Sequence, residues 1–136
     1  MIVVDASILA RFILREEGWE KARDLLASST AVTVDHALKE VLNAIWKAVR
    51  RGLIGHREAR EKARALTILV EKGVVTVEPE DSVLTDAFRL ALETGITVYD
   101  ALYVALALAK KATLATCDAR QAEAARQVGV NTRLLA

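Results

Sequence analysis

The chain has 136 residues, of which 53% are hydrophobic and 27% charged, and its 19 Lys and Arg residues almost balance its 18 Asp and Glu residues. This composition predicts one globular domain, and it excludes a disordered chain and a protein that binds nucleic acid through its overall charge. The longest apolar run, Ala101–Ala109, is far shorter than the ~20 residues that a membrane-spanning helix needs. Asp5 interrupts the stretch where a signal peptide would be apolar, and the single cysteine, Cys117, rules out an internal disulfide. We therefore expect a cytoplasmic protein with no membrane contact.

Short β-branched runs alternate with longer segments rich in Ala, Leu and Glu, which is the pattern of strands and crossover helices around a parallel sheet. In chain order, the predicted strands are Ile2–Val4, Ala31–Val34, Val74–Val77, Thr113–Ala115 and Thr132–Leu134. The predicted helices are Ser7–Leu14, Trp19–Ala27, Ala37–Arg51, Arg57–Val70, Val83–Thr94, Tyr99–Lys110 and Ala119–Val128. Each predicted strand is apolar on consecutive residues and is expected to be buried on both faces. The helix at 99–110 is apolar almost all round and should be the central buried helix.

One segment, residues 47–64, concentrates basic charge. Seven Lys and Arg residues against two Glu residues give it a local excess of five positive charges, so the rest of the chain is acidic. Two interpretations stay open. The first is a pair of solvated helix faces that carry the i,i+4 pairs Arg57–Glu61 and Glu58–Lys62. The second is a surface that contacts phosphate groups.

Two acids directly follow predicted strands. Asp5 comes after the first strand and Asp118 shortly after the fourth, so both should lie at the carboxyl edge of the sheet, where open α/β sheets bind ligands. Each acid also precedes a helix, and a structural role explains it equally well. Asp5 would then be an acid favoured by the helix dipole, with Ser7 as the cap, and Asp118 would be an N-cap.

Glu40 and Asp100 also have two interpretations. Glu40 lies off the apolar stripe of helix 37–51, which comprises Leu38, Val41, Leu42, Ile45 and Val49, and such a face usually meets water. Glu40 is nevertheless expected in the first turn after the second strand, close to the same sheet edge. Asp100 is the only acid in the apolar helix, and Thr97 three residues earlier makes the segment similar to a capping box.

Four ionised carboxylates at one sheet edge would repel one another, so such a cluster implies either bound cations or raised pKa values. Carboxylate oxygens are hard ligands that select Mg²⁺ or Mn²⁺. The two histidines and one cysteine lack the spacing of a zinc site. The sequence also has no Gly-rich phosphate loop and no Gly-x-Ser-x-Gly nucleophile elbow.

The segments around these acids resemble the PIN-domain ribonucleases, in particular the toxin component of VapBC-type toxin–antitoxin modules. The resemblance is carried by Val3–Ser7, Glu40–Ile45, Tyr99–Ala107 and Leu114–Asp118, whose order and spacing extend over essentially the whole chain. It implies a single PIN domain over residues 1–136. It also implies a three-layer α/β fold in which a short parallel sheet of about five strands is flanked by about seven helices.

The resemblance further implies an Mg²⁺- or Mn²⁺-dependent endoribonuclease in which Asp5, Glu40, Asp100 and Asp118 are both the metal ligands and the catalytic residues. A water activated by the metal would hydrolyse an RNA phosphodiester bond. Ser7, Asn43 and Thr116 match supporting polar positions near that site. The basic segment offers candidate contacts to the RNA backbone, namely Arg50, Arg51, Arg57 and Arg60.

Proteins of this kind imply two protein partners, a second copy of the chain and a cognate antitoxin that enters the acidic cleft. Trp19 and Trp46, on helices expected near the surface, are either interface residues or ordinary core residues. A PIN-fold nuclease acting in RNA processing or on DNA remains an alternative, as does a non-catalytic PIN-fold interaction module. A phosphoacceptor receiver domain is a third, although Ala6 rather than a second acid follows Asp5 and the last strand carries Arg133 rather than a Lys.

Overall fold

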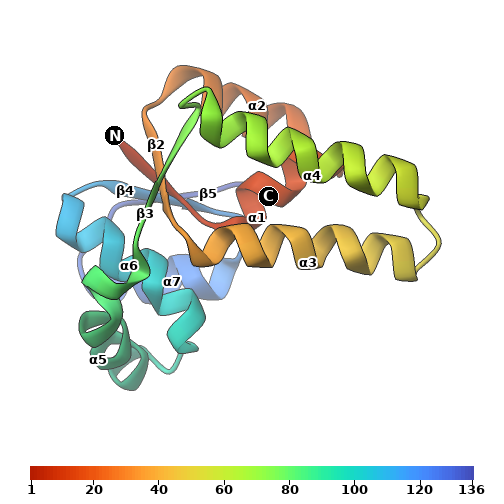
Figure 1. The fold of residues 1–136 in the computed structure, drawn as a ribbon. Coiled ribbons are helices and arrows are strands. Elements are labelled where there is room, and N and C mark those ends of the chain that lie inside the picture. Colours follow the sequence, from red (N-terminus) through yellow and green to blue (C-terminus); the bar gives the residue numbers. More distant parts are fainter.

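The computed structural model describes all 136 residues and consists of a five-stranded parallel sheet flanked by seven α-helices (Figure 1). The elements are β1 (Ile2–Val4), α1 (Ala6–Leu14), α2 (Trp19–Ser28), β2 (Ala31–Val34), α3 (His36–Arg50), α4 (His56–Glu71), β3 (Val75–Glu78), α5 (Leu84–Thr94), α6 (Val98–Lys110), β4 (Thr113–Thr116), α7 (Ala119–Gln127) and β5 (Thr132–Leu134). A short 3-10 helix, η1 (Glu80–Val83), precedes α5. The expected α/β fold is therefore confirmed, and no element end lies more than one residue from the predicted one.

The sheet has the strand order β3-β2-β1-β4-β5, with every neighbouring pair parallel. Receiver domains have the flavodoxin-like order 2-1-3-4-5, so the receiver alternative is wrong. The chain runs outward from β1 in one direction through β2 and β3, and in the other direction through β4 and β5. The switch point, where open α/β sheets bind ligands, therefore lies between β1 and β4.

Burial of the strands follows their position in the sheet. All residues of β1 and β2 are buried, as expected. The expectation of burial on both faces is wrong for the two edge strands, because an edge strand has only one neighbour and less cover from the helices. Val75 is the only buried residue of β3, and Arg133 and Leu134 of β5 are exposed.

Helices cover the two faces of the sheet in separate layers, with α1, α2 and α4 on one side and α5, α6 and α7 on the other (Figure 1). The predicted central helix is confirmed, since seven consecutive residues of α6, from Ala101 to Ala107, are buried. None of the seven helices alone has both the length and the apolar composition of a membrane-spanning segment.

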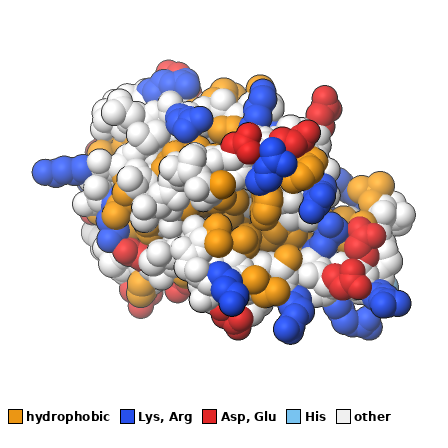
Figure 2. All heavy atoms as spheres, turned by 90° about the horizontal axis from the view of Figure 1, so that it is seen from above, with side chains coloured by type: hydrophobic (Ala, Val, Ile, Leu, Met, Phe, Trp, Pro, Cys, Tyr) orange, Lys and Arg blue, Asp and Glu red, His pale blue; other side chains and the backbone are white.

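The helices α3 and α4 form a hairpin that projects beyond the sheet, to the right in Figure 1. Their projection explains why the predicted apolar stripe of α3 is only partly buried. Val41 and Ile45 lie in the core, but Leu42 is exposed and Trp46 keeps 57% of its surface accessible. Charged side chains of both signs crowd this end of the molecule (Figure 2).

Candidate functional site

Asp5 lies at the switch point of the sheet, directly after β1, and is only 5% exposed. Its Oδ1 accepts hydrogen bonds from the Ser7 hydroxyl (2.5 Å) and the Ile8 N–H (3.2 Å), and its Oδ2 accepts one from the Thr116 hydroxyl (2.5 Å). Asp5 is therefore itself the N-cap of α1, and the expectation that Ser7 would cap this helix is wrong, because α1 already begins at Ala6. Burial raises the pKa of Asp5 to about 6, since the hydrogen bonds from Ser7, Thr116 and Ile8 only partly offset the lost hydration.

Ser7 and Thr116 also connect the ends of the two central strands. The Ser7 hydroxyl, which donates to Asp5, accepts a hydrogen bond from the Cys117 N–H (2.9 Å). The Thr116 hydroxyl accepts one from the Asp118 N–H (3.0 Å) and also lies 2.9 Å from Oε1 of Gln121. A hydroxyl has one proton, so Thr116 donates to either Asp5 or Gln121 at any moment. The two supporting residues predicted near Asp5 are therefore in direct contact with it.

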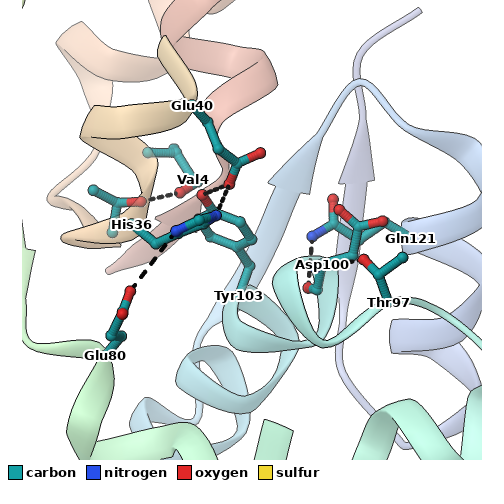
Figure 3. Close-up of polar contacts among 9 residues, drawn as sticks. Val4, His36, Glu40, Glu80, Thr97, Asp100, Tyr103 and Gln121 are labelled. Carbon is teal, nitrogen blue, oxygen red and sulfur yellow. Dashed lines mark hydrogen bonds and ion pairs between the residues drawn. The ribbon is translucent and has the colours of Figure 1, made fainter. Parts of the chain in front are cut away.

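Gln121 is a residue that the sequence analysis missed. It is buried within α7, and its Nε2 donates to the backbone carbonyl of Asp100 at 2.9 Å (Figure 3). Together with the contact to Thr116, this bond links the start of α6 to the end of β4. The available signal was a glutamine three residues after Asp118, on the alanine-rich face of α7 that packs inward.

Asp118 and Asp100 both occupy helix starts. Asp118 is the N-cap of α7, where its Oδ1 accepts from the N–H groups of Arg120 (2.9 Å) and Gln121 (3.4 Å). At the start of α6 the Thr97 hydroxyl accepts from the Asp100 N–H (3.2 Å), which confirms this half of the predicted capping box. Burial raises the pKa of the Asp100 carboxyl, and the negative charges of Asp118 and Glu40 raise it further. Asp118 and Glu40 therefore both lie within electrostatic range of Asp100.

Glu40 completes the group from α3. Glu40 was expected in the first turn after the second strand. Because α3 already begins at His36, Glu40 lies in the second turn of the helix instead. Its face does not simply meet water. The Glu40 Oε1 accepts a hydrogen bond from the Tyr103 hydroxyl at 2.6 Å and lies 3.4 Å from Nε2 of His36 (Figure 3). The charge of Glu40 contributes to the raised pKa of Asp5. The contacts of Tyr103 and His36 were not predicted from the sequence.

The remaining candidates make no hydrogen bond to this group. Asn43 is exposed one turn after Glu40 on α3, and its side chain has no hydrogen-bond partner in the chain. The four arginines of the basic segment, Arg50, Arg51, Arg57 and Arg60, are all exposed at the far end of the α3–α4 hairpin. The ten residues from Glu40 to Arg50 correspond to about 15 Å along the helix axis. The predicted pairs of the solvated interpretation are present, since Arg57 lies 3.5 Å from Glu61 and Lys62 lies 4.0 Å from Glu58.

The four acids therefore arrive from four separate elements at one sheet edge, as expected. Their oxygens are the donor type that hard divalent cations prefer. Burial raises the pKa values of Asp5 and Asp100, repulsion from neighbouring acids raises them further, and a bound cation would relieve that repulsion. In this respect the residues fit a divalent metal. No three His, Cys, Asp or Glu side chains lie close enough together to form a complete ligand set in the structure.

The PIN domain family model matches residues 2–127 of the chain. Ribonuclease VapC3 of Pyrobaculum aerophilum is 41% identical over 123 residues, which cover 90% of this chain and 92% of the relative. Exonuclease VapC9 of the same organism is 32% identical over 116 residues, which cover 85% of this chain and 79% of the relative.

Among solved structures, the chain is similar to VapC20 of Mycobacterium tuberculosis, a toxin that cleaves the sarcin–ricin loop, with 25% identity and a TM-score of 0.67. The superposition covers 91% of this chain and 95% of VapC20. The same fold occurs, at 18% identity and a TM-score of 0.63, in VapBC-1 of nontypeable Haemophilus influenzae, with 99% of this chain and 98% of the other covered.

Proposed function

This chain belongs to the PIN domain family, and we propose that it is a VapC-type endoribonuclease that hydrolyses RNA phosphodiester bonds at Asp5, Glu40, Asp100 and Asp118. The observation that carries the proposal is the convergence of these four acids, from four elements, at the switch point of the sheet. The 41% identity to a ribonuclease over 90% of the chain supports RNA as the substrate. The proposal treats residues 1–136 as one PIN domain in the cytoplasm.

The four carboxylates would hold Mg²⁺ or Mn²⁺. Such a cation lowers the pKa of a bound water and neutralises charge on the phosphate. The contribution of the chain is to fix the acids. Ser7 and Thr116 hold both oxygens of Asp5 in place, and the backbone N–H groups of α7 orient Asp118. No Ser, Cys or His side chain is assigned the role of nucleophile.

Side chains outside the group of four acids would contact the RNA substrate. Asn43 lies on the solvent side of α3 one turn from Glu40, where its amide can reach a nucleotide bound at the cluster. Arg50, Arg51, Arg57 and Arg60 would contact phosphates further along the RNA, because the hairpin extends away from the acidic edge.

An antitoxin is proposed as the protein partner, with a basic side chain that enters the acidic edge in place of the cation. Its support is that chains of this fold occur in toxin–antitoxin complexes. Exposed apolar residues, among them Leu42 and Trp46 on α3 and Leu84, Phe88 and Leu92 on α5, also give a protein partner or a second copy of the chain surface to bury.

A second candidate function is exonuclease activity, which the 32% identity to an exonuclease favours. A covalently closed circular RNA distinguishes the two activities, because only an endonuclease can cut a molecule without ends. The assay uses purified full-length protein with circular and linear RNA in the presence of Mn²⁺, Mg²⁺ or excess chelator.

The proposal predicts that the circular RNA is cut with either cation and stays intact with chelator, and that the Asp118→Asn variant leaves it intact in every condition. Digestion of linear RNA alone would favour the exonuclease. If neither RNA is cut while the protein is folded, a DNA of the same sequence is tested next. Cleavage of the DNA alone would assign a different substrate, and no cleavage of either nucleic acid would make the chain a non-catalytic PIN-fold module.

A further inference from the structure

Tyr103 is a buried residue that contacts Glu40, a partly exposed member of the acidic group. The residue is only 1% exposed and comes from the middle of α6, yet its hydroxyl reaches Glu40, whose side chain on α3 keeps 35% of its surface accessible. The two residues are 63 positions apart in the chain. The contact is therefore a tertiary one that only the folded chain provides.

The length and the chemistry of this bond make it a strong one. At 2.6 Å it falls in the range of hydrogen bonds from a hydroxyl to a carboxylate, which are roughly twice as strong as bonds between neutral groups. The Glu40 carboxylate can only accept, so the Tyr103 hydroxyl is the donor of this bond.

Only one of the two Glu40 oxygens is used in this way. Both the Tyr103 hydroxyl and the more distant Nε2 of His36 lie next to Oε1, whereas Oε2 accepts no hydrogen bond from the chain. A carboxylate held by one oxygen cannot rotate freely, so its other oxygen faces a fixed direction. Figure 3 shows this arrangement, with the Tyr103 ring extending from α6 to the Glu40 carboxylate.

Tyr103, which contacts Glu40, lies on the same helix as a second acid, Asp100. Asp100 precedes Tyr103 by three positions on α6, and residues at this spacing lie on the same face of a helix. Glu40 and Asp100 have no direct hydrogen bond, although their charges interact. Tyr103 therefore connects the carboxylate of α3 with the helix face that carries Asp100.

We propose that Tyr103 is a positioning residue, whose hydroxyl holds Oε1 of Glu40 so that Oε2 is presented to the divalent cation. This inference rests on the function proposed above and adds to it a residue that contacts neither the RNA nor the cation and acts through Glu40. Partners that orient a metal-binding carboxylate commonly change metal affinity by about 10- to 100-fold when they are removed.

The test measures Mn²⁺ affinity of the full-length, chelator-stripped protein by electron paramagnetic resonance of free Mn²⁺. Tyr103→Phe removes only the hydroxyl and keeps the buried ring. We expect about 10- to 100-fold weaker Mn²⁺ binding, with a lower kcat and an unchanged KM for RNA. Tyr99→Phe is the matched control, because the Tyr99 ring stacks on His36 but is 62% exposed and its hydroxyl makes no hydrogen bond to the chain. Its Mn²⁺ affinity should equal that of the wild type.

The Glu40→Gln background separates this inference from the proposed function. If Tyr103 acts through Glu40, Tyr103→Phe causes no further loss of affinity in the Glu40→Gln protein. Wild-type affinity in Tyr103→Phe, or an equal loss in both backgrounds, would overturn the positioning role while leaving the four-carboxylate site intact. Wild-type affinity in Glu40→Gln would overturn the assignment of Glu40 itself, and the positioning role with it.

A second variant covers the case in which Tyr103→Phe does not fold, as judged by circular dichroism. Glu40→Asp keeps the negative charge but shortens the side chain by one methylene, which moves the carboxylate away from the Tyr103 hydroxyl. The substitution is at a partly exposed helix position that tolerates it. The positioning role predicts a loss of Mn²⁺ affinity similar to that of Tyr103→Phe, and unchanged affinity would contradict it.

Discussion

The carboxyl edge of the sheet and the far end of the α3–α4 hairpin both concentrate charge, but they hold it in different ways. At the sheet edge, Asp5 is buried and both of its oxygens accept hydrogen bonds from neighbouring side chains. On the hairpin, the four arginines are exposed. The one ion pair that any of them makes joins Arg57 to Glu61, with 3.5 Å between Nε and Oε1. Buried charges change stability and cation binding, whereas exposed charges mainly change salt-dependent encounter with other molecules.

The same helix carries both kinds of charge. The first half of α3 places Glu40 against Tyr103 of the core helix, and its last residue, Arg50, lies in solvent. Substitutions at the two ends of α3 should consequently affect different measurements, cation binding at the first half and salt-dependent RNA binding at the last residue.

The largest effect is expected from neutralising one acid at the sheet edge. Asp5→Asn, Asp100→Asn and Asp118→Asn should each lower cation-dependent RNA cleavage by more than about 100-fold, because an amide binds a hard cation more weakly than a carboxylate of the same size. Circular dichroism should show a folded protein in each case. Unfolded variants would mean that these acids are needed only as helix caps.

Metal-free stability should change in the opposite direction at Asp5. The folded-state pKa of Asp5, about 6, is higher than the ordinary value of 3.8, so its contribution to stability is fully present below pH 4 and is lost as the pH rises through 6. The Asp5→Asn protein has no carboxyl at this position, so its stability does not fall in this way as the pH rises. Its free energy of unfolding should exceed that of the wild type by up to about 3 kcal/mol at pH 7.

Denaturant titrations of both chelated proteins at several pH values test this prediction. The difference between variant and wild type should shrink as the pH falls from 7 to 4, since the wild-type carboxyl then becomes neutral. A constant difference over this range would mean that Asp5 has an ordinary pKa in the folded protein.

Removal of the two Gln121 side-chain contacts, to the Asp100 carbonyl and to the Thr116 hydroxyl, should have a smaller effect on stability and activity. Gln121→Leu fills a similar volume but leaves the Asp100 carbonyl and the Thr116 hydroxyl without this partner. A loss of about 1–3 kcal/mol in the free energy of unfolding is expected. Gln127→Leu, at the end of the same helix, provides a comparison at an exposed position. Equal stability of the two variants would show that these contacts contribute nothing.

The smallest effect is expected on the hairpin. Charge reversal at Arg50, Arg51, Arg57 or Arg60 should weaken RNA binding at low salt and reduce the slope of affinity against salt concentration, without a change in Mn²⁺ affinity. Fluorescence anisotropy with labelled RNA over a salt series measures both quantities. RNA affinity equal to that of the wild type at every salt concentration would return these arginines to the solvated interpretation.

Hydrophobic patterning was sufficient to predict the twelve main elements, because the strands are short β-branched runs and the helices are rich in alanine and leucine. The carboxyl-edge position of Asp5 and Asp118 followed from the strands that precede them. Strand order could not be predicted from these patterns, so the exposure of β5 at an edge was missed.

The contacts that orient the acids also could not be predicted from the sequence. Tyr103 lies within the apolar pattern of α6, where a tyrosine is indistinguishable from an ordinary core residue until its partner is known. Gln121 lies within the polar, alanine-rich pattern of α7, where a glutamine is expected to face solvent. Their partners, Glu40 and Asp100, are 63 and 21 positions away in the chain. The roles of the four acids as metal ligands stay a prediction.

In the proposed function the acidic sheet edge, and not the basic hairpin, holds the divalent cation. Calorimetric titration of Mn²⁺ into chelator-stripped wild type, Asp100→Asn and Arg57→Glu distinguishes the two regions. We expect saturable binding to the wild type and to Arg57→Glu with equal affinity, and at least about tenfold weaker binding to Asp100→Asn. Equal affinity of Asp100→Asn and the wild type, or no saturable binding to the wild type, would contradict it.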